Sequence, residues 1–117
     1  MDKKQIGNLG ETAVCDVLIT KGYKISCRNF HSRYGEIDVI AENEKTLIFI
    51  EVKTRAKGSL IRGRESVTKS KQQKIILAAQ GYLALFPSGK EIRFDVCELE
   101  HAGNKIVSIE ILENAFY

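Results

Sequence analysis

The sequence predicts a single α/β domain over residues 1–117, in which a mixed central sheet is flanked by helices in the order αβββαββ. Two stretches repeat their apolar residues at helical spacing, and five shorter stretches have the composition of strands. The second helical stretch lies between the third and fourth expected strands. At 117 residues the chain is long enough to form one hydrophobic core.

The first helix is expected over residues 3–21, where Ile6, Leu9 and further apolar residues form a broad arc. Gly22 follows directly and is typical of a helix end, because glycine readily adopts the left-handed conformation found there. Residues 23–29 are expected to form the first strand.

The next two strands are expected at residues 36–42 and 46–54, joined as a hairpin. Alternation places Ile37, Val39 and Ala41 on one face of the first of these strands. The opposite faces of the hairpin also carry apolar residues. Strands that are apolar on both faces lie in the interior of a covered sheet.

Residues 55–65 show no clear period and contain two glycines, so they are expected to form a loop. A second helix is expected within residues 66–86 and should end at the Pro-Ser-Gly sequence of residues 87–89. Residues 91–100 and 105–112 are expected to form a final hairpin.

The charge is distributed unevenly along the chain. The formal net charge is only +3, but residues 53–74 contain eight Lys or Arg and a single acid, a local charge of +7. The rest of the chain carries −4. A basic segment on a slightly acidic body suggests a surface that binds a polyanion. The alternative is a solvated loop with no ligand.

The cysteines and the apolar runs indicate the cellular location that is expected for the chain. Cys15, Cys27 and Cys97 are far apart, odd in number and embedded in apolar runs, so reduced core thiols in a cytoplasmic protein are expected. A zinc site and a disulfide framework are not expected. The N-terminus lacks the pattern of a signal peptide, and no apolar run has the length that a bilayer span requires, so no membrane association is expected.

Three charged residues interrupt the apolar strands of the expected hairpin: Asp38, Glu51 and Lys53. Because side chains alternate along a strand, Glu51 and Lys53 share a face. If Glu44 and Lys45 form a two-residue loop, Asp38 falls directly opposite Glu51. Opposed residues have Cβ atoms roughly 4.5–5.5 Å apart, so their two carboxylates could share one cation.

These residue types suit a divalent metal site. Mg²⁺ prefers oxygen ligands and is commonly held by one or two carboxylates. A lysine beside it can orient water or stabilise developing negative charge. Glu11, at the edge of the first helix, could reach the same site. The alternatives are a cross-strand ion pair among Asp38, Glu51 and Lys53, and a surface role for Glu11.

Beyond these single residues, the chain resembles the YraN-type family of small bacterial proteins (UPF0102), which belongs to the restriction-endonuclease-like PD-(D/E)xK nuclease superfamily. The similarity covers nearly the whole length. The matching residues are Gly10-Glu11, Arg28-Asn29, Arg33, Gly35-Glu36-Ile37-Asp38, Phe49-Ile50-Glu51-Val52-Lys53-Thr54-Arg55, Ser66-Val67, Lys71-Gln72 and Arg93-Phe94-Asp95-Val96. Ile37 stands where the superfamily motif has proline, a change that removes no ligand.

The resemblance implies a restriction-endonuclease-like fold and roles for five residues. Asp38 and Glu51 match the metal-binding acids, which would hold Mg²⁺ or Mn²⁺, and Lys53 matches the catalytic lysine. Glu11 matches the acid on the first helix of the related Holliday-junction resolvases. Gln72 is expected to support the site from the second helix.

A metal-dependent endonuclease acting on duplex or branched DNA is therefore the leading hypothesis. The residues expected to hold phosphates are Arg55, Arg62, Arg64, Lys69 and Lys71. Phosphate contacts of this kind position nucleic acid and read no sequence. The competing hypothesis is a non-catalytic DNA-binding or assembly module that retains the nuclease fold. Related resolvases pair two sites, so a homodimer is a further expectation.

Overall fold

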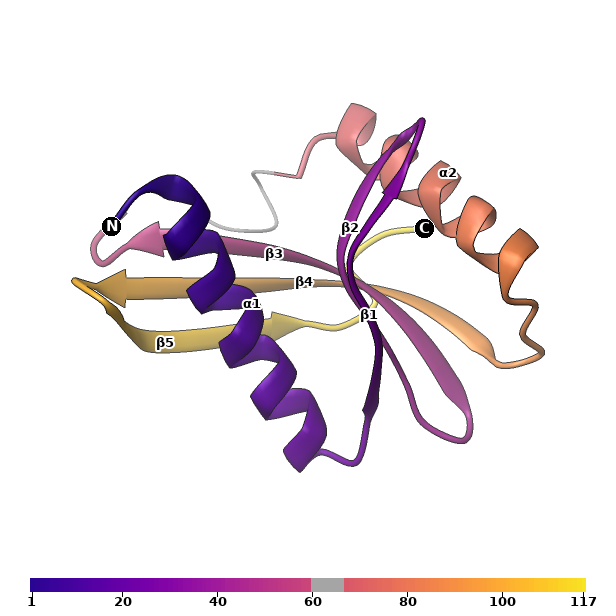
Figure 1. The fold of residues 1–117 in the computed structure, drawn as a ribbon, viewed down its shortest axis with the longest axis horizontal. Coiled ribbons are helices and arrows are strands. Elements are labelled where there is room, and N and C mark those ends of the chain that lie inside the picture. Colours follow the sequence, from indigo (N-terminus) through magenta and orange to yellow (C-terminus); the bar gives the residue numbers. More distant parts are fainter. Residues whose placement is uncertain (60–66) are drawn as a thin grey trace.

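The computed structural model describes residues 1–59 and 67–117, in which two helices and five strands follow the order αβββαββ (Figure 1). The predicted fold class and element order are confirmed. The elements are α1 (Lys3–Thr20), β1 (Lys24–Ser32), β2 (Gly35–Glu42), β3 (Thr46–Ala56), α2 (Lys69–Leu85), β4 (Glu91–Ala102) and β5 (Lys105–Leu112).

The five strands form one sheet in the order β1-β2-β3-β4-β5, with β3 in the middle. Strands β3 and β4 are parallel, whereas the other three pairs are antiparallel. A parallel pair needs a long connection between its strands, and α2 lies within this one. The sheet is therefore mixed, as the sequence predicts.

The hairpin of β2 and β3 has the register that an even loop requires. Its ladder runs from Glu42 opposite Leu47 to Val39 opposite Ile50. The Asn43 N–H donates to the Thr46 carbonyl at 3.0 Å, which leaves Glu44 and Lys45 as the two loop residues. The side-chain oxygen of Asn43 also accepts from the backbone N–H groups of Lys45 and Thr46 and holds the turn.

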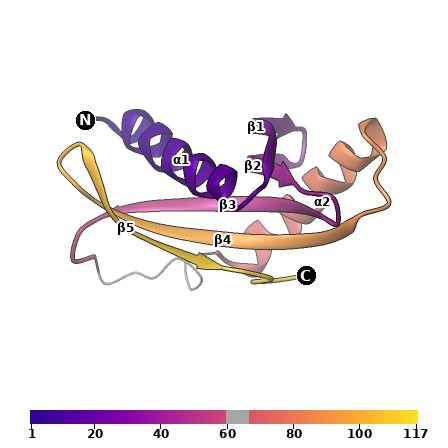
Figure 2. The ribbon, with the colours of Figure 1, turned by 90° about the horizontal axis from the view of Figure 1, so that it is seen from below.

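The core has two parts, one under each helix. Val14 and Leu18 of α1 pack on Ile48 and Ile50 of β3, together with apolar residues of β2 and β4. On the other side of the sheet, the cluster under α2 contains Phe49 of β3 and further apolar residues. Figure 2 shows α1 lying along one face of β3. Both faces of β3 are thus covered, which explains why its sequence lacks a polar face.

Strand β2 departs from the predicted alternation at Ile37. The sequence placed Ile37 on one face with Val39 and Ala41, but the structure puts Ile37 in the cluster under α2 and the other two in the cluster under α1. The reason is the coiling of the β1–β2 hairpin, which curls away from β3 toward α2 (Figure 1). The change of face falls at Asp38.

Several element ends also differ from the prediction. Strand β1 runs on to Ser32, and β3 continues to Ala56, so that Arg55 lies in a strand and not in a loop. The extra residues of β1 pair with residues 35–37 across a short turn, whereas Arg55 of β3 pairs with Glu100 of β4, which is distant in sequence. Local composition carries no signal for such pairing.

Two further features concern the cysteines and the helices. Cys15, Cys27 and Cys97 are all free, and Cys15 and Cys97 are buried. Neither described helix has both the length and the apolar character that crossing a membrane would take.

Candidate functional site

Asp38 lies where β2 parts from β3. The last ladder pair is Val39 with Ile50, and the register places Asp38 opposite Glu51 one step beyond it. There the Asp38 Oδ2 accepts the backbone N–H of Val52 at 2.8 Å, so a side chain takes the place of the next ladder bond. The facing positions of Asp38 and Glu51 follow from the two-residue loop.

The carboxyl groups of Asp38 and Glu51 are held together. Burial raises the pKa of Asp38 to about 8, and the side-chain hydrogen bond and charge of Glu51 contribute to that rise. The N–H of Val52 and the charge of Lys71 act in the opposite direction. The Glu51 residue is only 5% exposed. Near neutral pH the pair thus holds a proton that a bound cation would displace.

Lys71 places its ammonium group at this pair. Its Nζ lies 3.4 Å from the Glu51 Oε2, and α2 is capped at Thr68, whose side chain accepts the Lys71 N–H. The sequence predicted a phosphate contact for Lys71, whereas the structure brings it to the acids. No ion pair in residues 1–59 and 67–117 joins Lys53 to Asp38 or Glu51, so the predicted cross-strand ion pair is not formed there.

Glu11 reaches the edge of the same site from α1. It is 9% exposed, and its Oε1 lies 3.5 Å from a guanidinium nitrogen of Arg28. Burial and then the charge of Asp38 raise the pKa of Glu11, while hydrogen bonding by Asn29 acts against the rise. The β1–β2 register places Asn29 opposite Asp38. Three neighbouring strands and α1 therefore contribute to one polar site.

A close approach of α1 to β3 makes this arrangement possible. A Cβ atom at Gly10 would lie 1.9 Å from the Thr54 Oγ1, so only glycine fits there without a rearrangement. Gly10 directly precedes Glu11 in α1. The glycine thus allows the helix to bring Glu11 down to the sheet.

Lys53 and Gln72 occupy different settings. Lys53 alternates with Glu51 along β3, is half-buried, and pairs in register with Glu98 of β4. The Gln72 side-chain N–H donates to the Val67 carbonyl at 3.0 Å and ties down the segment before α2. Its described contact is therefore with the backbone and not with the acids.

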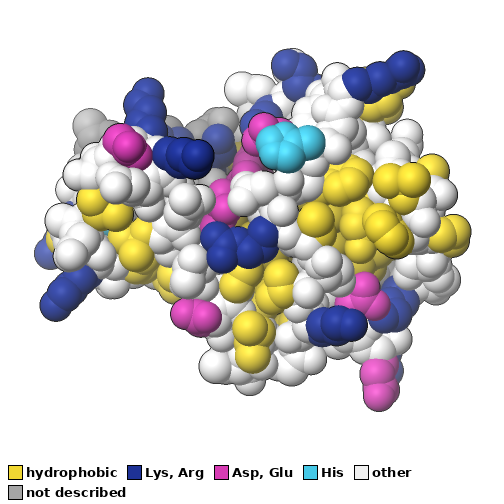
Figure 3. All heavy atoms as spheres, viewed as in Figure 1, with side chains coloured by type: hydrophobic (Ala, Val, Ile, Leu, Met, Phe, Trp, Pro, Cys, Tyr) yellow, Lys and Arg dark blue, Asp and Glu magenta, His cyan; other side chains and the backbone are white. Residues whose placement is uncertain are grey.

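The residues predicted to hold phosphates fall into three groups. Lys69 is exposed at the first residue of α2, and Arg55 is half-buried in β3. Arg62 and Arg64 lie outside the described residues. Acidic side chains gather near the middle of the face shown in Figure 3, with Lys and Arg side chains around them.

Four buried side-chain atoms in the described part of the chain lack a hydrogen-bond partner. They are Glu11 Oε1, Glu51 Oε2, Thr54 Oγ1 and Arg55 Nε. All four lie on α1 or on the second half of β3. Glu11 Oε1 and Glu51 Oε2 still have their ion pairs with Arg28 and Lys71. Buried polar atoms are nearly always hydrogen-bonded, so this concentration of atoms without a hydrogen bond is unusual for a structural site.

The oxygen donors present suit a hard divalent cation held by few protein ligands. Asp38 and Glu51 form a pair, but among residues 1–59 and 67–117 no three acidic, histidine or cysteine side chains converge as metal ligands. Glu11 lies beside this pair without completing a three-ligand cluster. A metal here would take its remaining ligands from water or a substrate.

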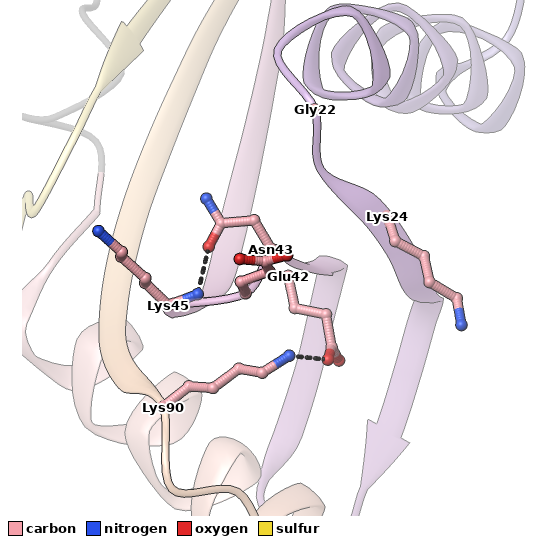
Figure 4. A pocket seen from close by; sticks show the side chains of 7 residues that line it. Gly22, Lys24, Glu42, Asn43, Lys45 and Lys90 are labelled. Atoms are coloured by element: carbon pink, nitrogen blue, oxygen red, sulfur yellow. Dashed lines mark hydrogen bonds and ion pairs between the residues drawn. The ribbon is translucent and has the colours of Figure 1, made fainter.

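A cavity of about 560 Å³ lies beside Glu42, the last residue of β2 (Figure 4). Lys90 pairs with Glu42, which also accepts from the Ser26 hydroxyl. These bonds, with the charges of Lys90 and Lys24, hold the pKa of Glu42 below its usual range. Its carboxylate is paired and ionises readily, in contrast to Asp38, whose pKa is raised.

The comparisons with known proteins agree with the sequence resemblance. Residues 10–99 match the model of the Uncharacterised protein family UPF0102. The chain belongs to this family. A UPF0102 protein of Desulfosudis oleivorans is 43% identical over 97% of the chain and 91% of its own length. UPF0102 proteins of Sulfurihydrogenibium sp. (42% identical, 99% of the chain and 97% of the relative) and Chlorobium phaeobacteroides (48%, 78% and 73%) are also similar.

The UPF0102 match spans the site, since Glu11, Asp38, Glu51 and Lys53 all fall within residues 10–99. Reasoning from single residues did not find the parts played by Arg28, Asn29 and Lys71. Asn29 has a φ of +54° inside β1, a conformation that strand alternation does not anticipate. The residues that match the family include Arg28-Asn29 and Lys71-Gln72, and this match was the sequence signal for their place in the site.

Proposed function

We propose that this UPF0102 protein is a divalent-metal-dependent endonuclease that hydrolyses phosphodiester bonds in duplex or branched DNA. The observation that carries the proposal is the Asp38–Glu51 pair. Two carboxyl groups are held in contact where β2 parts from β3, and burial, followed by the hydrogen bond and the charge of Glu51, raises the pKa of Asp38 to about 8. Such an arrangement costs stability unless a cation binds it.

Asp38 and Glu51 are the residues that would hold Mg²⁺ or Mn²⁺. A bound divalent ion would supply a more acidic water and would neutralise negative charge on the phosphoryl group. The Val52 N–H orients the Asp38 carboxylate, and β3 fixes Glu51. The chain therefore presents two oxygen donors whose positions are set by backbone structure.

Lys53 is the residue proposed to act on the reacting phosphate. Its ammonium group lies two residues beyond Glu51 on the same strand face. Neither an ion pair nor a hydrogen bond of Lys53 is found within the described ranges. A lysine without such a partner can stabilise the charge that develops on a phosphate oxygen or can position water.

The cations around the site would hold the DNA backbone. Arg55 and Lys69 carry positive charge on the two elements that flank the acids, and neither belongs to a described ion pair. Contacts of this type give affinity that falls with salt and carry no sequence preference. A homodimer would place two sites on one DNA molecule and allow both strands to be cut.

A second candidate is a DNA-binding module without catalysis, and the ion pair of Lys71 with Glu51 favours it. The protein's own ammonium, 3.4 Å from the Glu51 Oε2, partly balances the acidic pair without any metal. The two candidates differ in whether the acids respond to a divalent ion.

A metal titration and a cleavage assay on the same preparations test the proposal. Mn²⁺ binding is followed by calorimetry and by NMR line broadening, in wild type and in Asp38→Asn/Glu51→Gln. Cleavage is then measured on supercoiled, linear, single-stranded and four-way-junction DNA. We expect Mn²⁺ binding and cleavage in the wild type only. Equal Mn²⁺ responses in both proteins, with no cleavage of any DNA, would leave the binding module as the better account.

A further inference from the structure

The second half of α2 is apolar on all sides. Between residues 75 and 86, Gln80 is the only residue with a charged or amide side chain. A helix of this composition is normally buried all round. The sheet covers only one side of α2, and Leu77, Leu85 and Phe86 are 38%, 68% and 56% exposed. Figure 3 shows apolar side chains gathered over this part of the helix, so an apolar surface is left without a partner in the described chain.

Gly81 lies between the exposed leucines of this surface. A Cβ atom there would meet nothing within 4 Å, so contacts inside the chain do not require glycine. Glycine inside a helix is destabilising relative to alanine, so Gly81 is unfavourable for α2 alone. Leu77 and Leu85 lie four residues before and after it, and the three residues form one i±4 ridge of the helix. The gap at the centre of this ridge lets another backbone approach closely.

The ridge is symmetric about Gly81. Two copies of α2 that cross in antiparallel directions at Gly81 place Leu77 of each copy against Leu85 of the other. A surface that complements itself in this way is what a two-fold dimer requires. Packing of i±4 ridges into each other is also the commonest class of helix contact, with a crossing angle of about −50°.

Charges near the ends of α2 favour the same arrangement. Lys74 is exposed seven residues before the centre of the ridge, and Ser88 lies seven residues after it. Ser88 lines a cavity of about 500 Å³ together with Glu42 and Glu44. Glu42 pairs with Lys90, which also lines the cavity, whereas the exposed Glu44 belongs to no ion pair within the described ranges. In an antiparallel pair, Lys74 of one copy faces this cavity of the other and can pair with Glu44.

We propose that α2 forms the interface of a homodimer, in which two copies of the helix cross in antiparallel directions at Gly81. The inference rests on the proposed function only for the use of the dimer, which is to place two sites on one DNA molecule. Lys71, which reaches Glu51, lies ten residues before Gly81, about 15 Å along the helix axis. The two acidic sites therefore lie toward opposite ends of the helix pair, away from the contact at Gly81.

Sedimentation velocity over a range of protein concentrations measures the dimer, in EDTA and without DNA. In the wild type we expect the dimer fraction to rise with concentration. Leu85→Glu should raise the dimer dissociation constant at least about tenfold, because it would bury an unpaired charge. Ile19→Glu is the matched control, since Ile19 is also exposed but lies on α1, and it should leave the constant unchanged. A wild type that is monomeric at every concentration would overturn the inference.

A disulfide tests the helix crossing itself. In Gly81→Cys the two new thiols of a dimer lie on the two-fold axis, where closely packed helices meet the Cα separation of about 4.4–6.8 Å that a disulfide needs. Oxidation with copper phenanthroline should convert this variant to a covalent dimer. Gly7→Cys is the control, because Gly7 lies in α1 with equally open space around it and the same native cysteines are present. Equal cross-linking in the two variants would place the interface elsewhere.

An exchange of charges tests the antiparallel register. Lys74→Glu and Glu44→Lys should each weaken the dimer roughly two- to fivefold, as expected for a surface ion pair. The double variant should recover part of the loss, because the pair is restored with opposite polarity. Melting temperatures show that each variant is folded. Two independent losses without recovery would mean that Lys74 and Glu44 do not meet, which contradicts a crossing at Gly81.

The outcomes distinguish this inference from the proposed nuclease activity. A dimer that depends on Leu85 and cross-links through Gly81→Cys, in a protein that cleaves no DNA, would support the interface and remove the nuclease. Cleavage by a wild type whose dimer is unaffected by Leu85→Glu would overturn the interface and leave the nuclease proposal standing.

Discussion

Two aspartates of the same sheet, Asp95 and Asp38, lie in very different surroundings. Asp95 of β4 is 1% exposed and receives two hydrogen bonds from the guanidinium group of Arg93, each 3.0 Å long, and a third from the Asn114 N–H at 2.9 Å. Asp38 of β2 receives one backbone hydrogen bond and faces a second carboxyl group, that of Glu51.

The difference distinguishes a structural charge from a functional one. Every oxygen of Asp95 has a partner, and Arg93 also reaches Glu113, so this cluster joins β4 to the segment after β5. In the Asp38 site, Glu11 Oε1 and Glu51 Oε2 have ion-pair contacts of 3.5 and 3.4 Å but no hydrogen bond, and the pKa of Asp38 is raised. Acids with a raised pKa and few hydrogen bonds are typical of sites that bind ligands.

The largest expected effect on stability concerns the hydrogen-bonded pair of Arg93 and Asp95. Arg93→Ala should lower the free energy of unfolding by about 3–5 kcal/mol, because it leaves the buried Asp95 carboxylate without its counter-ion. Urea denaturation measures this change, and Arg33→Ala, at the exposed β1–β2 turn, serves as control. A loss below about 1 kcal/mol would mean that the Asp95 cluster is no more structural than a surface ion pair.

The next prediction concerns catalysis by Lys53. Lys53→Ala should slow cleavage on the order of 10²–10³-fold while DNA affinity and melting temperature stay near the wild-type values, because its charge is needed as the reaction proceeds. Lys53→Arg should rescue poorly, since a planar guanidinium does not replace a compact ammonium. Lys57→Ala, an exposed charge just after β3, is the control. A destabilised Lys53→Ala protein with wild-type cleavage would assign Lys53 a structural role.

A smaller effect tests how α1 reaches the acidic site. Gly10→Ala should destabilise the protein by about 1–3 kcal/mol, because the new methyl group would overlap the Thr54 side chain. Gly7→Ala, three residues earlier with open space around it, should instead stabilise the helix by up to about 1 kcal/mol. Thermal melting compares the two. Equal shifts would show that α1 does not press on β3 at Gly10.

Another expected effect is a pH dependence of stability that comes from Asp38. Its pKa is near 8 in the folded protein and 3.8 in the reference state, so the folded state binds the proton more tightly. The contribution of Asp38 to stability is therefore present in full below pH 3.8 and is lost as pH rises through about 8. Asp38→Asn should flatten this decline between pH 5 and pH 8.5, in melts made without metal. A parallel decline in the variant would assign the pH dependence to other groups.

In the wild type, a bound metal should change the same dependence of melting temperature on pH. Mg²⁺ or Mn²⁺ binds the ionised acids, so it should raise the melting temperature most at the high-pH end. Asp38→Asn should respond less. This comparison distinguishes an acid pair that binds a divalent cation from one whose negative charge is balanced by Lys71 alone.

The sequence by itself determined the order of the elements and the pairing of Asp38 with Glu51. Both depend on local rules, namely apolar periodicity, strand alternation and the length of the Glu44-Lys45 loop. Strand β3 was also predictable as an interior strand, because it is apolar on both faces. The resemblance added the roles of the acids and of Lys53.

Only the tertiary structure decided what surrounds that pair. Three features depend on how α1, α2 and a coiled hairpin pack against β3. They are the approach of Lys71 to Glu51, the change of face at Ile37 and the close contact of α1 with β3 at Gly10. These contacts join elements distant in sequence, and their geometry follows from the packing of whole elements. No local pattern carries that information, which is why the two acids could be paired from the sequence while their partners could not.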